Sequence, residues 1–268
     1  MRGAVYYPPC GAAARLLAPV DPWLGRRTTL GAAFVVLSAV KPTLRAEPGE
    51  AAPSLRHETP SPESPRPNSL NFYERWMLPP LLDRVMRQSQ LEKYRREVIA
   101  PARGRVLEIG VGSGLNFPFY GAQVEMVVGV DPSPRLLALA QRRAADAGVK
   151  AELVEGTASA LPLADRSIDT IVMTWTLCSI PDPLLALREM RRVLKPDGRL
   201  LFIEHGLCPE KGVEFWQHRL TPAWRHVSGG CQLDRKMDDL IRAAGFELTE
   251  LRHPYAEGPR IFTYMYEG

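Results

Sequence analysis

The chain has 268 residues, of which 45% are hydrophobic and 24% are charged, a length and composition that suit one globular domain with an additional segment. These values exclude a collagen, a coiled coil and a highly charged disordered chain. The formal net charge is +4, of which residues 1–70 supply +3 (eight Lys and Arg against five Asp and Glu), so the nearly neutral remainder lacks the basic footprint of a nucleic-acid-binding protein.

Residues 1–69 are interpreted as a leader followed by a linker. Arg26 and Arg27 precede an apolar run, Leu30–Val40, of about eleven residues, shorter than the roughly 20 that span a bilayer and as long as the core of a signal peptide. No small-residue cleavage site follows this run, so an export signal, an organelle-targeting or membrane-surface segment and a mis-started leader all stay open. Residues 47–68 are mostly Pro, Ser, Glu and Ala, a composition typical of a disordered linker.

The four cysteines give no metal or disulfide pattern along the sequence. Cys10, Cys178, Cys208 and Cys231 lie too far apart for a C-x-x-C motif, so we predict no metal site and a reducing, cytoplasmic compartment. Gathering of the last three around a soft metalloid such as arsenic is the alternative. Peripheral contact with a membrane and the oligomeric state stay open.

Ordered structure is expected from about residue 70. Apolar residues between Phe72 and Met86 recur at helical spacing, and a second helix is expected at Leu91–Ile99. Five apolar segments then predict strands, at Arg105–Ile109, Val124–Val130, Ala151–Val154, Ile168–Met173 and Arg199–Ile203. Helices are expected among them, at Pro134–Ala147 and Pro183–Leu194. This alternation predicts an α/β fold, doubly wound around a mostly parallel sheet.

The last part of the chain predicts a sheet edge and an insertion. A helix is expected at Met237–Ala244, and strands at Phe246–Leu251 and Arg260–Tyr266 are expected to form a hairpin-like edge. The segment at about residues 205–236 is rich in Trp, His, Gly and Cys, and it is expected as an insertion at the carboxyl end of the sheet. A substrate lid belongs at that end.

A glycine-rich loop, E-I-G-V-G-S-G at residues 108–114, follows the first strand. This is the context that a nucleotide-binding loop requires, because glycine lets the backbone take positive φ and approach a ligand closely. The dinucleotide motif G-x-G-x-x-G would place its third glycine at position 115, which is Leu115. The carboxylate of Glu108 favours a ligand with cationic groups over an anionic pyrophosphate.

Asp131 ends the second strand, 17 residues after Gly114. At that place an acid accepts hydrogen bonds from both hydroxyls of a ribose. The loop and this acid together predict a ligand that contains a ribose and a cationic group.

At these residues the chain resembles the class I S-adenosylmethionine-dependent methyltransferases, over roughly residues 72–267. Shorter motifs at Leu161–Leu163, Ser167–Asp169 and Arg192–Gly198 contribute to the resemblance. It implies a seven-stranded Rossmann-like sheet with an antiparallel last strand, and S-adenosylmethionine bound across the carboxyl ends of the first two strands. The cofactor contacts that it implies come from Glu108, Gly110, Gly112, Gly114, Asp131, Pro132, Thr157, Ala158 and Thr174.

The sequence departs from the family after the third strand. Many members have an acid there that contacts the adenine amine, whereas this chain has Gly156-Thr157-Ala158. We expect Thr157 to hydrogen-bond the base instead.

More narrowly, the chain resembles the thiol S-methyltransferase branch and its bacterial relatives, near the quinone and phospholipid methyltransferases. The motifs behind this are Thr176–Ser179, Glu204-His205, Phe215–Gln217, Pro222–Trp224 and Gly230–Leu233. The branch implies a small or lipid-like acceptor, such as a thiol.

Candidate catalytic and acceptor residues lie in the same motifs. His205 follows a strand and titrates near neutrality, so it is either a general base or a hydrogen-bonded structural histidine, with His218 and His226 as weaker candidates. The expected acceptor pocket contains Phe72, Tyr73, Trp175, Cys178, Trp216 and Trp224. Packing in the core and the lid is the alternative role for these side chains.

Three classes of function stay open from the sequence. The first is a methyltransferase, acting on a thiol or, alternatively, on phospholipid nitrogen or quinone carbon. The second is a catalytically silent S-adenosylmethionine-binding protein, which needs the same loop and acid. The third is a nicotinamide oxidoreductase, which Leu115 disfavours.

Overall fold

The computed structural model describes residues 73–268, so the predicted leader, the linker and Phe72 lie outside the described residues. The described chain begins with a π-helical turn, η1 (Tyr73–Met77), followed by helices α4 (Leu78–Met86) and α5 (Ser89–Ile99). The prediction of two short helices before the first strand is confirmed.

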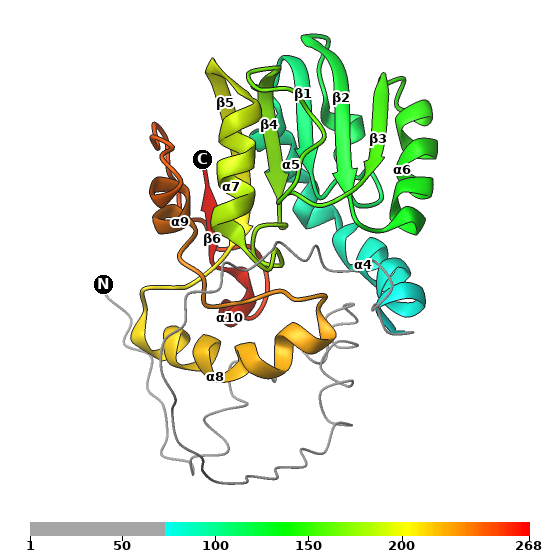
Figure 1. Cartoon of the computed structure of the whole chain (residues 1–268). Coiled ribbons are helices and arrows are strands. Elements are labelled where there is room, and N and C mark those ends of the chain that lie inside the picture. The colour runs from blue at the N-terminus through cyan, green and yellow to red at the C-terminus, as the bar shows by residue number, and fades with distance from the viewer. Residues whose placement is uncertain (1–72) are drawn as a thin grey trace, which may run out of the picture. The chain divides into compact units, whose positions relative to one another are not determined.

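Six strands of the described chain form one sheet (Figure 1), in the order β3-β2-β1-β4-β5-β6. They are β1 (Gly104–Ile109), β2 (Val124–Asp131), β3 (Ala151–Glu155), β4 (Ile168–Thr174), β5 (Leu194–His205) and β6 (Met265–Glu267). The first five are parallel to their neighbours, whereas β6 pairs with β5 in the antiparallel sense. The predicted fold class is confirmed, but the expected strand count is wrong, because the sheet has six strands rather than seven.

The two strands predicted near the C-terminus differ from the structure. No strand forms at Phe246–Leu251, and the backbone beyond it makes only isolated bridges at Arg252 and Tyr255. A strand forms only where a neighbouring strand provides backbone hydrogen-bond partners along its length. The neighbouring strand here, β6, has only three residues. The predicted strand at Arg260–Tyr266 is wrong over its first half, where the residues form the short helix α10 (Arg260–Thr263). In a segment this short, the apolar pattern does not distinguish one helical turn from a strand.

Helices cover both faces of the sheet. The remaining ones in the described chain are α6 (Pro134–Asp146), α7 (Pro183–Val193), α8 (Lys211–Val227) and α9 (Met237–Ala243), with a 3-10 turn, η2 (Phe117–Phe119). Ile99 of α5 and Ala140 of α6 pack with Val127 on one face. On the other face, Leu187 of α7 and Ile241 of α9 join a second buried cluster. The parallel strands are thus buried on both sides, which explains their continuous apolar sequences.

The insertion predicted at about residues 205–236 consists largely of helix α8, which the sequence analysis did not predict. This helix lies beyond the end of the sheet to which the arrowheads of β1 to β4 point (Figure 1). Gln217 is buried in α8 and its Nε2 donates to the carbonyl oxygens of Gly206 and Ile261, both at 3.0 Å. Its Oε1 accepts from the backbone N–H of Cys208 at 2.8 Å. These bonds fix α8 at the carboxyl end of the sheet.

Candidate cofactor and acceptor site

The glycine loop turns sharply where β1 ends. Its three glycines have positive φ, 64° at Gly110, 54° at Gly112 and 80° at Gly114. A Cβ added at Gly110 would lie 2.4 Å from the Thr176 side chain, so packing requires glycine there. A Cβ at Gly112 would meet only the Gly110 carbonyl oxygen, at 3.8 Å. The loop therefore has open space beside Gly112, where a ligand can approach the backbone.

The carboxyl group of Asp131 lies next to the same glycine. It accepts hydrogen bonds from the backbone N–H of Gly112 at 3.0 Å and from that of Ser133 at 2.8 Å. Burial raises the pKa of Asp131 to about 6, although both N–H donors act to lower it. The fold thus brings together the two features that the sequence analysis paired, the glycine loop and the acid at the end of β2.

Glu108 lies under the loop in a hydrogen-bonded network. Its Oε1 accepts from Asn116 Nδ2 at 2.8 Å and its Oε2 from the Tyr120 hydroxyl at 2.6 Å. Burial raises the pKa of Glu108 to about 7, and the two donors partly oppose this. Sequence reasoning missed Asn116 and Tyr120, because they belong to no motif and reach Glu108 only through the fold of the η2 turn.

A buried arginine, Arg95 of α5, completes this network. It is 5% exposed, and its Nη1 donates to Asn116 Oδ1 at 2.6 Å. Its guanidinium carbon also lies 4.8 Å from the centre of the Trp175 ring. Burial lowers the pKa of Arg95 to about 10, which leaves it charged at neutral pH. Arg95 therefore supplies the positive charge that compensates the buried carboxyl group of Glu108.

Asp83 of α4 ties the glycine loop to two helices. Its Oδ1 accepts from Ser113 Oγ at 2.5 Å and from Arg143 Nη1 at 2.7 Å, and Arg87 forms an ion pair with its Oδ2. Arg143, on α6, also donates to the Ser113 carbonyl oxygen at 2.8 Å. Burial acts to raise the pKa of Asp83, but the hydrogen bonds from Arg143 and Ser113 hold it below its ordinary value. The loop conformation thus depends on side chains outside the sequence motif.

The buried carboxyl groups predict how stability changes with pH. Asp131 and Glu108 have pKa values of about 6 and about 7 in the folded protein, above their ordinary values of 3.8 and 4.5. Over this range the folded protein keeps protons that the unfolded chain releases. These two groups are therefore expected to lower the free energy of unfolding without cofactor as the pH rises from about 4 to about 7, and Glu204, whose pKa burial raises to about 8, extends the fall to about pH 8. Thermal melting at a series of pH values measures this.

The variant Glu108→Gln provides the control for the pH series. Its carboxamide does not titrate, so the dependence of Tm on pH is expected to become shallower between about pH 4.5 and pH 7, where folded and unfolded Glu108 differ in protonation. A Tm that rises through the window in the unsubstituted protein would contradict the prediction.

Other residues expected to contact the cofactor lie at the same end of the sheet. Pro132 follows β2 and is exposed, and Thr157 and Ala158 follow β3, the first exposed and the second buried. Thr174 ends β4, and its Oγ1 accepts a hydrogen bond from Asn116 Nδ2 at 3.1 Å. Their contacts with the cofactor stay predictions.

Trp175 has an unusual backbone at the end of β4. Its φ is 51°, a left-handed conformation that is rare for a bulky side chain. The backbone N–H of Trp175 donates to the Ile203 carbonyl oxygen at 2.8 Å, which holds the turn against β5. Residues in such conformations concentrate at functional sites, because the surrounding structure must stabilise them. The role of Trp175 in the acceptor pocket stays a prediction.

Two further aromatic residues that the sequence singled out contact α8 or belong to it. The Tyr73 hydroxyl donates to the Val227 carbonyl oxygen at 2.7 Å, joining η1 to the end of α8. Trp216 packs edge to face with Phe215, with ring centres 5.3 Å apart. Phe215 is 58% exposed, so this pair lies at the surface of α8.

The structure joins three residues that the sequence analysis considered separately. The ligand atoms of Cys178, His205 and Cys231 all lie within 4.8 Å of one another. His205 Nε2 is 2.9 Å from Cys231 Sγ, to which Trp224 Nε1 also donates at 3.2 Å. A hydrogen bond with Cys231 and burial raise the pKa of Cys178, and hydrogen bonds from Cys178 and Trp224 lower the pKa of Cys231. Cys208 lies elsewhere, with its Sγ 2.9 Å from the Tyr255 hydroxyl.

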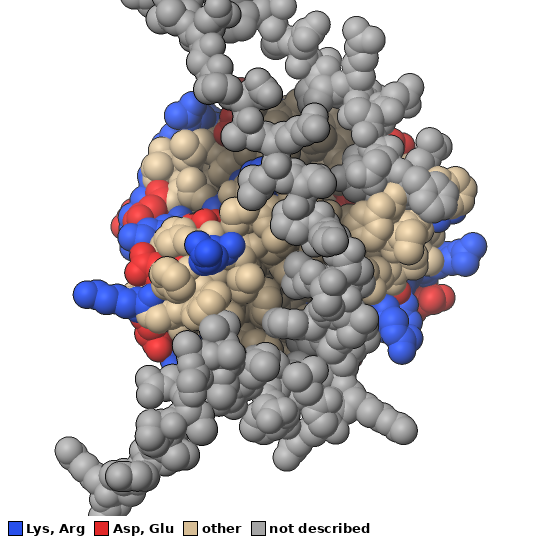
Figure 2. All heavy atoms as spheres, turned by 90° about the horizontal axis from the view of Figure 1, so that it is seen from below, with Lys and Arg blue, Asp and Glu red and all other residues tan. Residues whose placement is uncertain are grey.

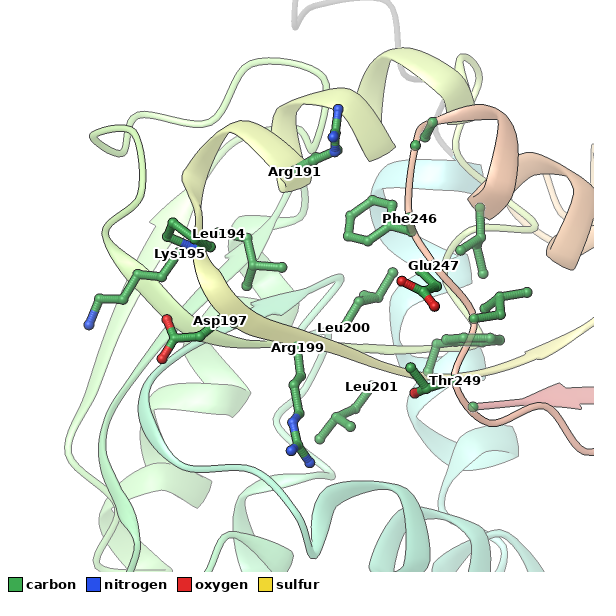
Figure 3. A pocket seen from close by; sticks show the side chains of 18 of the residues that line it. Arg191, Leu194, Lys195, Asp197, Arg199, Leu200, Leu201, Phe246, Glu247 and Thr249 are labelled. Atoms are coloured by element: carbon green, nitrogen blue, oxygen red, sulfur yellow. The ribbon is translucent and has the colours of Figure 1, made fainter.

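A separate cavity of about 1140 Å³ lies at the opposite end of the sheet, where β5 begins. Figure 3 shows Arg191, Lys195 and Asp197 around it, together with Phe246 and Glu247 from the segment after α9. Basic and acidic side chains both line this cavity. Because it is remote from the carboxyl ends of the strands, it is not the site that the glycine loop forms.

The face at the carboxyl ends of the strands can be followed in Figure 2. Where described atoms are visible, most of the Lys, Arg, Asp and Glu side chains lie toward the two sides of the view, with uncharged residues between them. Among residues 73–268, no helix is long and apolar enough to cross a membrane.

Comparison with known proteins identifies the family. A family model described as "Methyltransferase domain" matches residues 107–202. Human thiol S-methyltransferase TMT1B is 35% identical over 180 residues, which cover 62% of this chain and 72% of that protein. The rat protein of the same name is 37% identical over 150 residues, covering 54% of this chain and 61% of that one. The chain belongs to the class I S-adenosylmethionine-dependent methyltransferases.

Within that class, the thiol S-methyltransferases TMT1B are relatives that the chain resembles. The chain spans 61% of the rat relative's length. Among solved structures, a methyltransferase candidate from Bacillus halodurans C-125 has a TM-score of 0.53 at 24% identity, covering 63% of this chain and 73% of that one. This likeness shows the fold.

The residues present fit S-adenosylmethionine as the cofactor. Open space beside Gly112 admits a ligand to the backbone, and Asp131 offers a carboxyl group to ribose hydroxyls at the same point. Glu108 lies directly below the loop, where its buried carboxyl group is held by Asn116 and Tyr120. When bound, the cofactor supplies an activated methyl group.

Proposed function

We propose that this protein transfers the methyl group of S-adenosylmethionine to a small thiol. The observation that carries the proposal is the environment beyond the ends of β4 and β5, where Cys178 Sγ lies 3.8 Å from the Trp175 carbonyl oxygen and Trp224 Nε1 donates to Cys231 Sγ at 3.2 Å. The similarity of the chain to named thiol S-methyltransferases points to the same acceptor class. Phospholipid nitrogen and quinone carbon are the alternative acceptors.

Methyl transfer requires the protein mainly to align the two reactants. The acceptor sulfur forms a bond to the methyl carbon while the carbon–sulfonium bond breaks, and its electron pair remains on the departing sulfur. The thiol proton passes to solvent, because a free thiol has a pKa of about 8.5 and a fraction ionises at neutral pH. The proposal therefore does not depend on His205 as a base. The chain's own residues orient the two reactants and exclude water.

The experiment compares matched acceptors on the full chain. Formation of the demethylated cofactor is measured with a small alkyl thiol, the alcohol of the same carbon skeleton, an ethanolamine phospholipid in vesicles and a quinol. We expect turnover with the thiol and little with the alcohol, because an alcohol ionises far less at neutral pH. Turnover with only the phospholipid or the quinol would replace the thiol proposal by that alternative. Cofactor-induced melting shifts without turnover on any acceptor would favour a silent binding protein.

Asp131→Ala is the variant that links turnover to the proposed cofactor contacts. Losing the carboxyl group is expected to weaken S-adenosylmethionine binding by about 1–3 kcal/mol, as for other charge-assisted hydrogen bonds. The matched control is Asp197→Ala, an exposed acid beside the remote cavity (Figure 3), which is expected to leave affinity unchanged. Titration calorimetry measures both variants, and equal affinities would remove Asp131 from the site.

A further inference from the structure

Three ligand-bearing side chains converge from segments that are distant in the sequence. Cys178 lies in the turn after β4, His205 ends β5, and Cys231 follows α8. Their sulfur and nitrogen atoms all lie within 4.8 Å of one another, and His205 Nε2 is 2.9 Å from Cys231 Sγ. Both cysteines are buried, Cys178 at 2% and Cys231 at 8% exposure.

The atoms match the ligand set of a soft cation. Zn²⁺ binds thiolate sulfur at about 2.3 Å and imidazole nitrogen at about 2.0–2.1 Å in a tetrahedral arrangement, so its ligand atoms lie roughly 3.5–4 Å apart. The ligand atoms of the cluster all lie within 4.8 Å of one another, and His205 Nε2 and Cys231 Sγ, 2.9 Å apart, would separate by a small side-chain rotation to admit the ion. Two sulfurs with one imidazole select Zn²⁺ or Cd²⁺ over Mg²⁺ or Ca²⁺, which prefer oxygen.

Surrounding groups hold the ligands in place. Trp224 Nε1 donates to Cys231 Sγ at 3.2 Å, which is the kind of outer contact that orients a metal-bound thiolate. The buried carboxyl group of Glu204 accepts the backbone N–H groups of Leu177 at 2.9 Å and Cys178 at 3.4 Å. Arg235 donates to the carbonyl oxygen of Leu177, at 2.5 Å, within the same turn. The position of Cys178 is thus fixed without a metal.

We propose that Cys178, His205 and Cys231 bind one soft divalent cation of the Zn²⁺ class. This goes beyond methyl transfer, and it differs from the prediction of no metal site, because residues 27 and 26 positions apart in sequence meet only in the fold. On binding, two sulfur–metal bonds and one nitrogen–metal bond form, and the thiol protons pass to solvent without any change of oxidation state. A fourth position of the tetrahedral ion stays open.

Cation binding should stabilise the domain, since the ligands join the turn after β4, the end of β5 and the loop after α8. A ligand that binds only the folded state at about a hundredfold excess over its Kd raises Tm by about 5–10 °C for a domain of this size. Thermal melting therefore gives a readout that does not involve methyl transfer.

The direct experiment titrates the reduced, metal-free full chain with Cd²⁺ and follows ultraviolet sulfur-to-metal charge-transfer absorption. We expect one Cd²⁺ per chain, with affinity falling about 100-fold or more in Cys178→Ser and in Cys231→Ser. The matched controls are Cys208→Ser, which removes a buried cysteine outside the cluster, and Cys10→Ser, and both are expected to bind as the unsubstituted chain does.

Two results would overturn the proposal. One is the absence of a charge-transfer band in the folded, unsubstituted chain at micromolar Cd²⁺, and the other is a band that survives in Cys178→Ser and Cys231→Ser. If these variants do not fold, X-ray absorption on the Zn²⁺-loaded unsubstituted chain decides. Two sulfur neighbours with nitrogen support the site, whereas a shell of oxygen and nitrogen alone refutes it.

Discussion

Replacing Glu204 with alanine is expected to lower the free energy of unfolding by about 3–5 kcal/mol. The Glu204 side chain is fully buried, and its Oε1 accepts the backbone N–H groups of Thr176 at 2.6 Å and Leu177 at 2.9 Å. Each buried donor left without a partner costs about 1–3 kcal/mol, and the lost side chain leaves a cavity. Denaturant unfolding at pH 7 measures the change.

The conservative variant Glu204→Gln separates hydrogen bonding from charge. Burial raises the pKa of Glu204 to about 8, so at pH 7 the carboxyl group is mostly protonated and resembles a carboxamide. Glutamine keeps an oxygen acceptor at Oε1, and we expect it to retain most of the stability. Glu247→Ala, an exposed acid beside the remote cavity, is the matched surface control, expected within about 0.5 kcal/mol of the unsubstituted chain. Equal losses in the alanine and glutamine variants would contradict the hydrogen-bond explanation.

Alanine substitutions at Gly112 and Gly114 are expected to affect different properties: Gly114→Ala mainly lowers stability, whereas Gly112→Ala mainly lowers cofactor affinity. At Gly114 a Cβ would lie 2.6 Å from the Phe117 ring and 3.0 Å from the Ala140 backbone, and φ is 80°. Overpacking and left-handed strain together predict a loss of about 2–5 kcal/mol in the free energy of unfolding. The clash with backbone cannot be relieved by rotating a side chain.

At Gly112, by contrast, a Cβ meets open space. Only the strain of the left-handed backbone is therefore expected to lower the free energy of unfolding, by about 1–2 kcal/mol. The added methyl group would occupy the place where a ligand approaches the loop, and S-adenosylmethionine affinity is expected to fall at least about tenfold, or 1.4 kcal/mol. Melting curves and calorimetry on both variants test this. If Gly112→Ala bound the cofactor as tightly as the unsubstituted chain, the cofactor would not contact the loop there.

The sequence by itself determined the fold class, and it predicted the glycine loop and the acid as the centre of the cofactor site. Strands and helices of ordinary length alternate, and their apolar patterns depend only on which faces of each element are buried. The glycines at 110–114 and the acid at 131 were found for the same reason, because positive φ and a strand end are local properties of the chain.

Only the tertiary structure decided which distant side chains meet. Asn116 and Tyr120 belong to no motif, yet both reach Glu108, and Asp83 reaches the loop from a helix 30 residues away from Ser113. The same holds for Cys178, His205 and Cys231, whose separation in sequence excludes any spacing motif. The missing strand at Phe246–Leu251 depended on the length of its neighbour, β6. Contacts of this kind follow from how the elements pack, and residue periodicity carries no information about packing partners.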